Sequence, residues 1–153
     1  MPFNTSFTTG DVLTATDLNT IAGSWDAYTP TIGGTGWALG NGTITGRWKK
    51  IGRVVHVRVR VTFGTTSTYG GGALTISAPT AAQGVDVPGV CILNDTGTAT
   101  YTGYVFINGS TFQPFAQVTS AGHASVAVVI STVPFTWAST DYIELNITYE
   151  SAS

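Results

Sequence analysis

Charged side chains are scarce in this chain of 153 residues. Only 9% of its residues are Asp, Glu, Lys or Arg, against about 25% in ordinary globular proteins. The net charge of −2 is too small to indicate that the whole domain binds a polyanion. A surface poor in charge suits a protein that stays bound in an assembly, because charged residues are depleted at interface cores. A threonine-rich β fold has the same composition, so both interpretations stay open.

The chain also has a single cysteine and no long apolar run. Cys91 has no partner for an internal disulfide, and its apolar neighbours predict a small buried hydrophobe. No run reaches the roughly 18 apolar residues of a membrane span, and the N-terminus lacks the basic and apolar regions of a signal peptide. We therefore expect a soluble protein, made in a cytoplasm, with no membrane partner.

The sequence also lacks the residue groups that catalyse reactions or bind metals and cofactors. The two histidines, His56 and His123, have no nucleophile motif around them, and the eight acidic residues are scattered rather than paired for glycoside hydrolysis. Two distant histidines and a lone cysteine do not form a metal-ligand set, and the glycine clusters lack the GK[ST] that follows a phosphate loop. We expect no enzymatic activity, no metal and no cofactor.

The clearest structural pattern of the sequence lies in residues 42–64. Every second residue from Val55 to Phe63 is apolar, which predicts a β-strand with one buried face. Ile44 and Trp48 alternate in the same way upstream, and residues 50–53 between the two runs predict the turn of a hairpin. This hairpin carries all six basic residues of the chain: Arg47, Lys49, Lys50, Arg53, Arg58 and Arg60.

The rest of the chain after residue 24 also reads as β structure. Further strands are predicted over residues 25–32, 73–78, 89–94, 100–108, 111–119, 125–131 and 142–150. Pro30 confines the first of these to an edge or an irregular section, because proline cannot donate to the ladder, and Asn108-Gly109 predicts a tight hairpin turn. Eight or nine short strands with frequent turn signals predict an all-β antiparallel sandwich or jelly roll.

The first 24 residues differ from the β domain at 25–153. Residues 1–12 have no core periodicity and predict an extended arm that orders on a neighbour. Thr14 and Asp17 resemble a capping box with a shorter acid than usual, and Gly23 is a plausible stop, so one short helix is predicted over 13–23. We expect this region to dock the chain onto a larger particle through its apolar residues, Phe3, Phe7, Val12, Leu13 and Leu18.

Three features allow two interpretations each. Trp37 and Leu39, in a glycine-rich loop, predict either a cap over one end of the domain or an exposed contact surface. Both faces of the strand at 100–108 are largely apolar, which predicts packing on both sides or a subunit contact. Arg58 and Arg60 either form a patch for an anionic polymer or pair with Glu144 and Glu150 of the last strand, within one chain or across a subunit boundary. We favour pairing.

Three segments together resemble a family of structural proteins of tailed bacteriophages, often phages of actinobacteria. The segments are FTTGDVLTATDLN at 7–19, WDAYTPT at 25–31 and GTITGRWKKIGRVV at 42–55. The family pattern is an opening GxVLTAxDLN, a YTPT strand and a GNGTxTGRYxxIGxxV hairpin. The resemblance covers about the first 65 residues, and the rest of the chain matches only in character.

This resemblance implies a β-sandwich displayed on the virion surface, commonly as a homotrimer, with no catalytic residue. The partners would be other virion proteins of the capsid or the tail, and no nucleic acid. A capsid decoration or head-fibre protein and a tail receptor-binding protein fit equally. A further alternative is a carbohydrate-binding module for a host cell-wall glycan, whose aromatic contacts would be Trp37, Tyr69 and Trp137.

Overall fold

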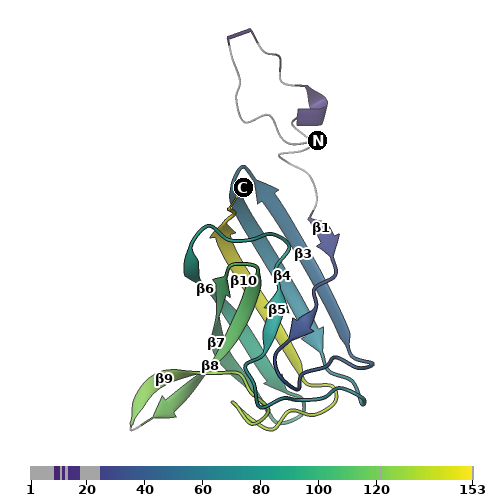
Figure 1. The fold of residues 1–153 in the computed structure, drawn as a ribbon, viewed down its shortest axis with the longest axis vertical. Coiled ribbons are helices and arrows are strands. Elements are labelled where there is room, and N and C mark those ends of the chain that lie inside the picture. Colours follow the sequence, from purple (N-terminus) through teal and green to yellow (C-terminus); the bar gives the residue numbers. More distant parts are fainter. Residues whose placement is uncertain (1–8, 11, 13, 18–24, 121, 153) are drawn as a thin grey trace.

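A computed structural model describes residues 9, 10, 12, 14–17, 25–120 and 122–152 of the chain. In this part, ten strands form one antiparallel sheet, and residues 15–17 form a helical turn (Figure 1). The strands are β1 (Asp26–Tyr28), β2 (Ile32–Gly33), β3 (Thr43–Ile51), β4 (Val54–Thr62), β5 (Thr75–Ser77), β6 (Val85–Asp95), β7 (Ala99–Asn108), β8 (Thr111–Ser120), β9 (His123–Val128) and β10 (Tyr142–Glu150). The predicted all-β antiparallel class is confirmed.

The sheet curls back on itself, and one short segment joins its two edges. The strand order is β1-β3-β4-β10-β6-β7-β8-β5-β2, and β9 lies off this path, paired to β8. β1 and β2 therefore lie at opposite edges, although only residues 29–31 separate them in the sequence. Four peptide units span at most about 14 Å, so the two edges lie close together in space. The single strand predicted over 25–32 is wrong: Pro30 breaks it into two edge strands, which raises the strand count to ten.

The side chains enclosed by this curl form the core. The alternating apolar residues of β4, predicted to face inward, are all buried, as are their counterparts on β10, Ile143, Leu145, Ile147 and Tyr149. Each fully buried aliphatic side chain contributes roughly 1.5–3 kcal/mol. The central hairpin is also confirmed, with β3 and β4 paired along their full length. Its turn begins at Gly52, whose φ of 59° is a conformation that favours glycine.

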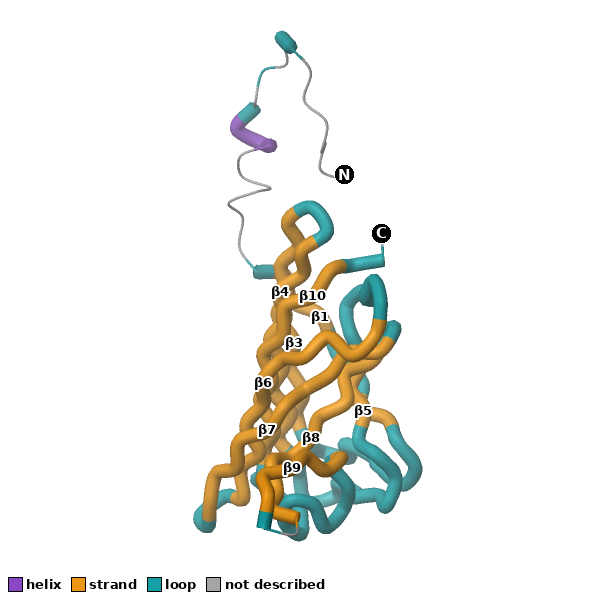
Figure 2. Tube along the Cα trace, turned by 90° about the vertical axis from the view of Figure 1, so that its left-hand side faces the viewer, coloured by secondary structure: helices purple, strands orange, loops and turns teal. Residues whose placement is uncertain are grey.

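The domain has two distinct ends (Figure 2). At one end lie the turn between β3 and β4, the first residue of β1, which is opposite Trp48, and the end of β10, whose Glu150 is opposite Val54. Arg53 joins the hairpin turn to the chain just after β10, because its guanidinium donates to the carbonyl of Ser151 over 3.0 Å and 3.2 Å. The chain thus enters and leaves the sheet at the same end.

Aromatic rings close the opposite end. The Trp37 indole packs against Phe63, Tyr69 and Trp137 with centroid separations of 5.8, 6.0 and 6.4 Å, and Phe135 extends the cluster with its ring centroid 4.4 Å from that of Trp137. Of the two interpretations of Trp37 and Leu39, the cap is correct. Trp37 is buried, and Leu39 packs half-buried against the core.

The remaining strands follow the predicted pattern with two shifts. The tight turn at Asn108-Gly109 joins β7 and β8 as predicted. β6 begins four residues before the predicted start, at Val85, and reaches Pro88 through a register shift between Val85 and Val87. Pro88 is accommodated because β10 pairs with β6 only from Val90 onward, so the proline lies where one edge of β6 is free. β9 begins two residues before the strand predicted at 125–131.

Candidate functional site: the outer face of the sheet

The outward side chains of the sheet are arranged in rows that cross the strands. One row follows the strand register without a break through Arg47, Arg58, Asn146, Val90, Tyr104, Phe115 and Val128. Residues directly opposite one another share a face of the sheet, so these side chains are neighbours on the convex surface. We call this surface the outer face. It is cationic on β3 and β4 and apolar on β6 to β9.

The cationic half holds two arginines paired with one carboxylate and a third arginine beside them. Arg58 Nε donates to Glu144 Oε1 over 2.7 Å, and Arg60 Nη1 donates to Glu144 Oε2 over 3.2 Å. The Arg60 guanidinium also lies 4.0 Å from the centroid of the Tyr142 ring, a cation–π contact. The Glu144 side chain is only 16% exposed, while both arginines remain about half exposed. Both carboxylate oxygens of Glu144 are therefore already engaged.

Arg47 is the third arginine of this half. It lies directly opposite Arg58 on the neighbouring strand, and none of the described residues offers it an ion pair or a hydrogen bond. Beside it is an open hollow of about 750 Å³, lined by Arg47, Arg58, Asn146 and the exposed indole of Trp25. A second hollow, of about 450 Å³, shares Trp25 and Asn146 with the first and extends to His56, whose Nδ1 is 2.9 Å from Thr148 Oγ1.

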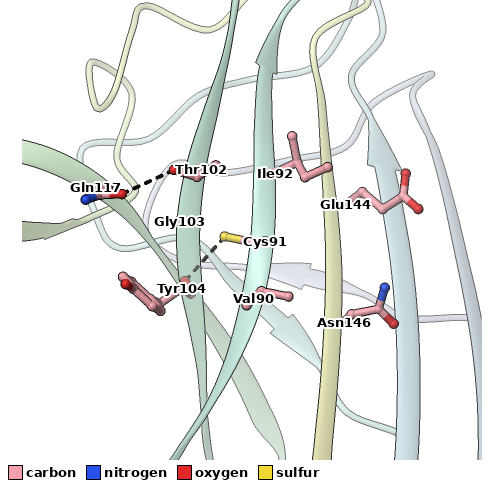
Figure 3. A pocket seen from close by; sticks show the side chains of 9 residues that line it. All are labelled: Val90, Cys91, Ile92, Thr102, Gly103, Tyr104, Gln117, Glu144 and Asn146. Carbon is pink, nitrogen blue, oxygen red and sulfur yellow. Dashed lines mark hydrogen bonds between the residues drawn. The ribbon is translucent and has the colours of Figure 1, made fainter.

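The apolar half consists of large side chains that nothing in the described chain covers. Val90 is 61% exposed, and Ile92, Tyr104 and Val126 are also exposed. Figure 3 shows Val90, Ile92 and Tyr104 around a shallow pocket of about 340 Å³, with Glu144 and Asn146 at its margin. The interpretation that β7 packs on both sides within this chain is therefore wrong, because one of its two faces stays open. A subunit contact stays a prediction.

Cys91 lies beneath this pocket and faces the interior. Its Sγ is 3.3 Å from the carbonyl oxygen of Tyr104 (Figure 3), and the residue is buried, as predicted. Burial raises the pKa of the thiol to about 12. The thiol is therefore a structural group and offers no nucleophile to the pocket.

Of the four residues predicted to pair, the structure brings three into contact and places Glu150 apart from them. Arg58, Arg60 and Glu144 form one cluster within a single chain. Glu150 lies at the far end of β10, where it pairs with Arg53 over 3.2 Å. An assignment of Glu150 to Arg58 or Arg60 within one chain is wrong, because two outward positions of β10, Asn146 and Thr148, separate it from Glu144.

Of the three aromatic residues expected to contact a glycan, Trp37 and Trp137 are buried and Tyr69 is half-buried. Trp37 and Trp137 are only 7% and 3% exposed, and their indole N–H groups donate to the carbonyls of Gly72 and Ile130 over 2.7 Å and 3.1 Å. Tyr69 packs against Phe63 in the same cap, with its hydroxyl buried. These three positions are corrected to structural aromatics, since their rings are used in closing the end of the sheet.

Most of the residues expected to dock the chain lie outside the described residues: Phe3, Phe7, Leu13 and Leu18. Val12 is described and is 82% exposed. The predicted capping interaction of Thr14 and Asp17 is confirmed, since each backbone N–H donates to the other side chain, over 3.0 Å and 3.2 Å. The bonds that the Asp17 carboxylate accepts from the Thr14 hydroxyl and from the Thr14 backbone N–H lower the pKa of Asp17.

Sequence reasoning missed Arg47, Asn146 and Trp25 as parts of one surface. The position of Arg47 could have been predicted, because a hairpin that turns at residues 52 and 53 pairs position 47 with position 58. Asn146 follows from the alternation of β10 once that strand is known to lie beside β4. Trp25 carries no such signal, because its position depends on which edge of the sheet β1 joins.

Among the described residues, no cluster of three or more His, Cys, Asp or Glu side chains could hold a metal ion. No helix in the described part of the chain is long and apolar enough to cross a membrane. Comparisons with protein-family models, with curated protein sequences and with solved structures gave no significant match.

Proposed function

We propose that this chain is a non-enzymatic surface protein of a tailed-bacteriophage particle, in which residues 1–24 dock onto the particle and the β domain forms a trimeric knob. The observation that carries the proposal is the uncovered apolar half of the outer face, at Val90, Ile92, Tyr104 and Val126. Soluble monomers rarely leave contiguous apolar side chains exposed, and such surfaces mark sites of association. Contact between copies through this half would cover them.

The direction of the chain supports the same assignment. Residues 7–19, 25–31 and 42–55 carry the resemblance to phage structural proteins, and the third of these segments lies in the β3–β4 hairpin. The chain enters and leaves the sheet at the hairpin end, so an arm bound to a particle holds that end. The aromatic cap at the opposite end then faces away from the particle, with the outer face along the side.

The assembly is tested by a pair of matched substitutions. Val126 and Val54 are both 45% exposed, but Val126 lies in the apolar half of the outer face and Val54 lies at the hairpin turn. We expect Val126→Asp to reduce the mass measured by sedimentation equilibrium from three chains to one, because a desolvated carboxylate at the interface core is costly. Val54→Asp should leave the trimer unchanged. A wild-type protein that sediments as a monomer at micromolar concentration contradicts the trimer.

The location on the particle is tested separately. A capsid decoration protein and a tail receptor-binding protein both fit the proposal. Cryo-electron microscopy of particles with and without this chain should show difference density either at capsid symmetry axes or at the tail, and each position excludes the other role. Particles without the chain should also fail to adsorb to host cells if the tail role holds. Absence of the chain from purified particles contradicts the virion assignment.

A further inference from the structure

The cationic half of the outer face has more arginines than carboxylates that pair with them among the described residues. Arg47, Arg58 and Arg60 lie on this half, and Glu144 pairs with Arg58 and Arg60 but not with Arg47. Both oxygens of Glu144 are occupied by Arg58 and Arg60, and Arg47 has no partner among the described residues. Like charges that face each other across a strand pair are destabilising. An anion between Arg47 and Arg58 would turn this repulsion into attraction for both groups.

The space beside these arginines is an open hollow of about 750 Å³, and the described residues that line it are Trp25, Arg47, Arg58 and Asn146. These side chains offer three kinds of contact to a ligand. The arginines supply forked donors for an oxyanion, Asn146 supplies amide donors and an acceptor, and Trp25 supplies an exposed flat aromatic face.

These contacts together match one ligand class. A sugar ring presents C–H groups on its faces, which suit the indole, and hydroxyl groups at its rim, which suit the amide of Asn146. A carboxylate or phosphate on that sugar would fill the position between the arginines. A nucleic-acid backbone would need cations along its path, but the row beyond Asn146 continues with Val90 and Tyr104. The surface therefore favours a short anionic sugar over a polynucleotide.

We propose that Trp25, Arg47, Arg58 and Asn146 form a binding site for an oxyanion-bearing glycan, with Arg47 and Arg58 holding the carboxylate or phosphate and Trp25 stacking on the sugar ring. The site requires neither the trimer nor a particular location on the particle. It replaces Trp37, Tyr69 and Trp137 as glycan contacts. Arg58 keeps its bond to Glu144 in this arrangement, because Glu144 orients the guanidinium beside the hollow.

The test uses the full chain and isothermal titration with four probes. Trigalacturonate supplies carboxylates, glucose 6-phosphate supplies a phosphate, maltotriose is neutral, and a thymidine decanucleotide represents nucleic acid. We expect at least one of the two anionic sugars to bind and maltotriose to bind at least tenfold more weakly. Binding of both anionic sugars indicates any oxyanion, and binding of one identifies its source. Failure of both at millimolar concentration, or tighter binding of the oligonucleotide, overturns the proposal.

Two charge-matched variants assign the site. Arg47→Gln should weaken binding of the anionic sugar about tenfold, equivalent to about 1.4 kcal/mol. Lys50→Gln removes the same charge from the opposite face of β3, where residue 50 is opposite the inward Val55, and should change binding less than twofold. The bound sugar should also raise the melting temperature of the wild type but not that of Arg47→Gln. Equal weakening in both variants would show a general charge effect and would contradict the site.

Discussion

At the residue scale, close contacts between strands beneath the outer face leave no room for a side chain at one position of β7. Gly103 of β7 lies opposite Cys91 and Ala116. A Cβ atom at this position would lie 2.2 Å from the carbonyl oxygen of Phe115 and 2.9 Å from Cys91 Sγ. The first neighbour belongs to the backbone of the adjacent strand, so it cannot move aside without disturbing the ladder. Glycine is required here for space.

Gly103→Ala should therefore lower the free energy of unfolding by about 1–3 kcal/mol, the usual cost of overpacking a core. Urea denaturation followed by tryptophan fluorescence measures this change. Gly71→Ala is the control, because a Cβ at Gly71 meets nothing within 4 Å. A loss of stability at Gly71 that equals the loss at Gly103 would refute the steric explanation.

At the element scale, one carboxylate holds the segment that leads into β10. Asp141 is 2% exposed, and its two oxygens accept bonds from the backbone N–H groups of Thr96 and Ala138 over 2.9 Å and 2.7 Å. Thr96 also donates its hydroxyl to the carbonyl of Thr140 over 2.8 Å. Thr140 has a φ of 75°, which few residues other than glycine adopt. The start of β10 is thus tied to the β6–β7 turn by Asp141.

Asp141→Ala should cost about 3 kcal/mol or more, because it leaves two backbone donors without the charged acceptor that each bonds. The midpoint of urea unfolding measures the loss. Asp95→Ala, at the end of β6 next to that turn, should change the midpoint little, because the Asp95 carboxylate accepts no hydrogen bond from the described residues. Equal effects of the two substitutions would mean that the bonds of Asp141 contribute no stability of their own.

Elements with local signals were predictable from the sequence. The period of two in β4 and β10 depends only on neighbouring residues, and so do the turns at Gly52 and at Asn108-Gly109. Long-range placement was not predictable. The separation of residues 25–32 into two edges depends on how far the whole sheet curls, and the burial of Trp37 and Trp137 depends on loops that meet from distant parts of the chain. The arginine cluster was predictable in part, because hairpin pairing is local and the neighbour of β4 is not.

At the scale of the whole molecule, the single cysteine reports on the integrity of the sheet. Cys91 lies on β6, which pairs with β10 and β7 near the middle of the strand order. Because burial raises its pKa from 9.0 to about 12, the folded protein should hold almost no thiolate at pH 8, and a disulfide reagent such as DTNB should react only through unfolding. The unfolded chain, with an ordinary thiol, should react at once.

The same shift predicts how stability depends on pH. Above about pH 9 the unfolded state loses the Cys91 proton while the folded state keeps it. The stability that the protonated Cys91 contributes to the fold is therefore complete below pH 9 and is lost as the pH rises towards 12. Urea midpoints at pH 8, 10 and 11 should fall in that order, and the fall should be smaller in Cys91→Ala. An unchanged fall in that variant would assign the effect to other groups, such as Tyr149, whose pKa is also raised by burial.

The link at residues 29–31 also has a kinetic meaning. β1 and β2 are adjacent in the sequence, yet each pairs with a strand at a different edge, and both pairings exist together only after the curl has formed. We therefore expect the segment at 26–33 to pair with both edges late in folding, after the other strands have paired. Until it closes, β3 and β5 are open strands that another copy can pair with. Slow closure would thus favour domain-swapped or aggregated chains.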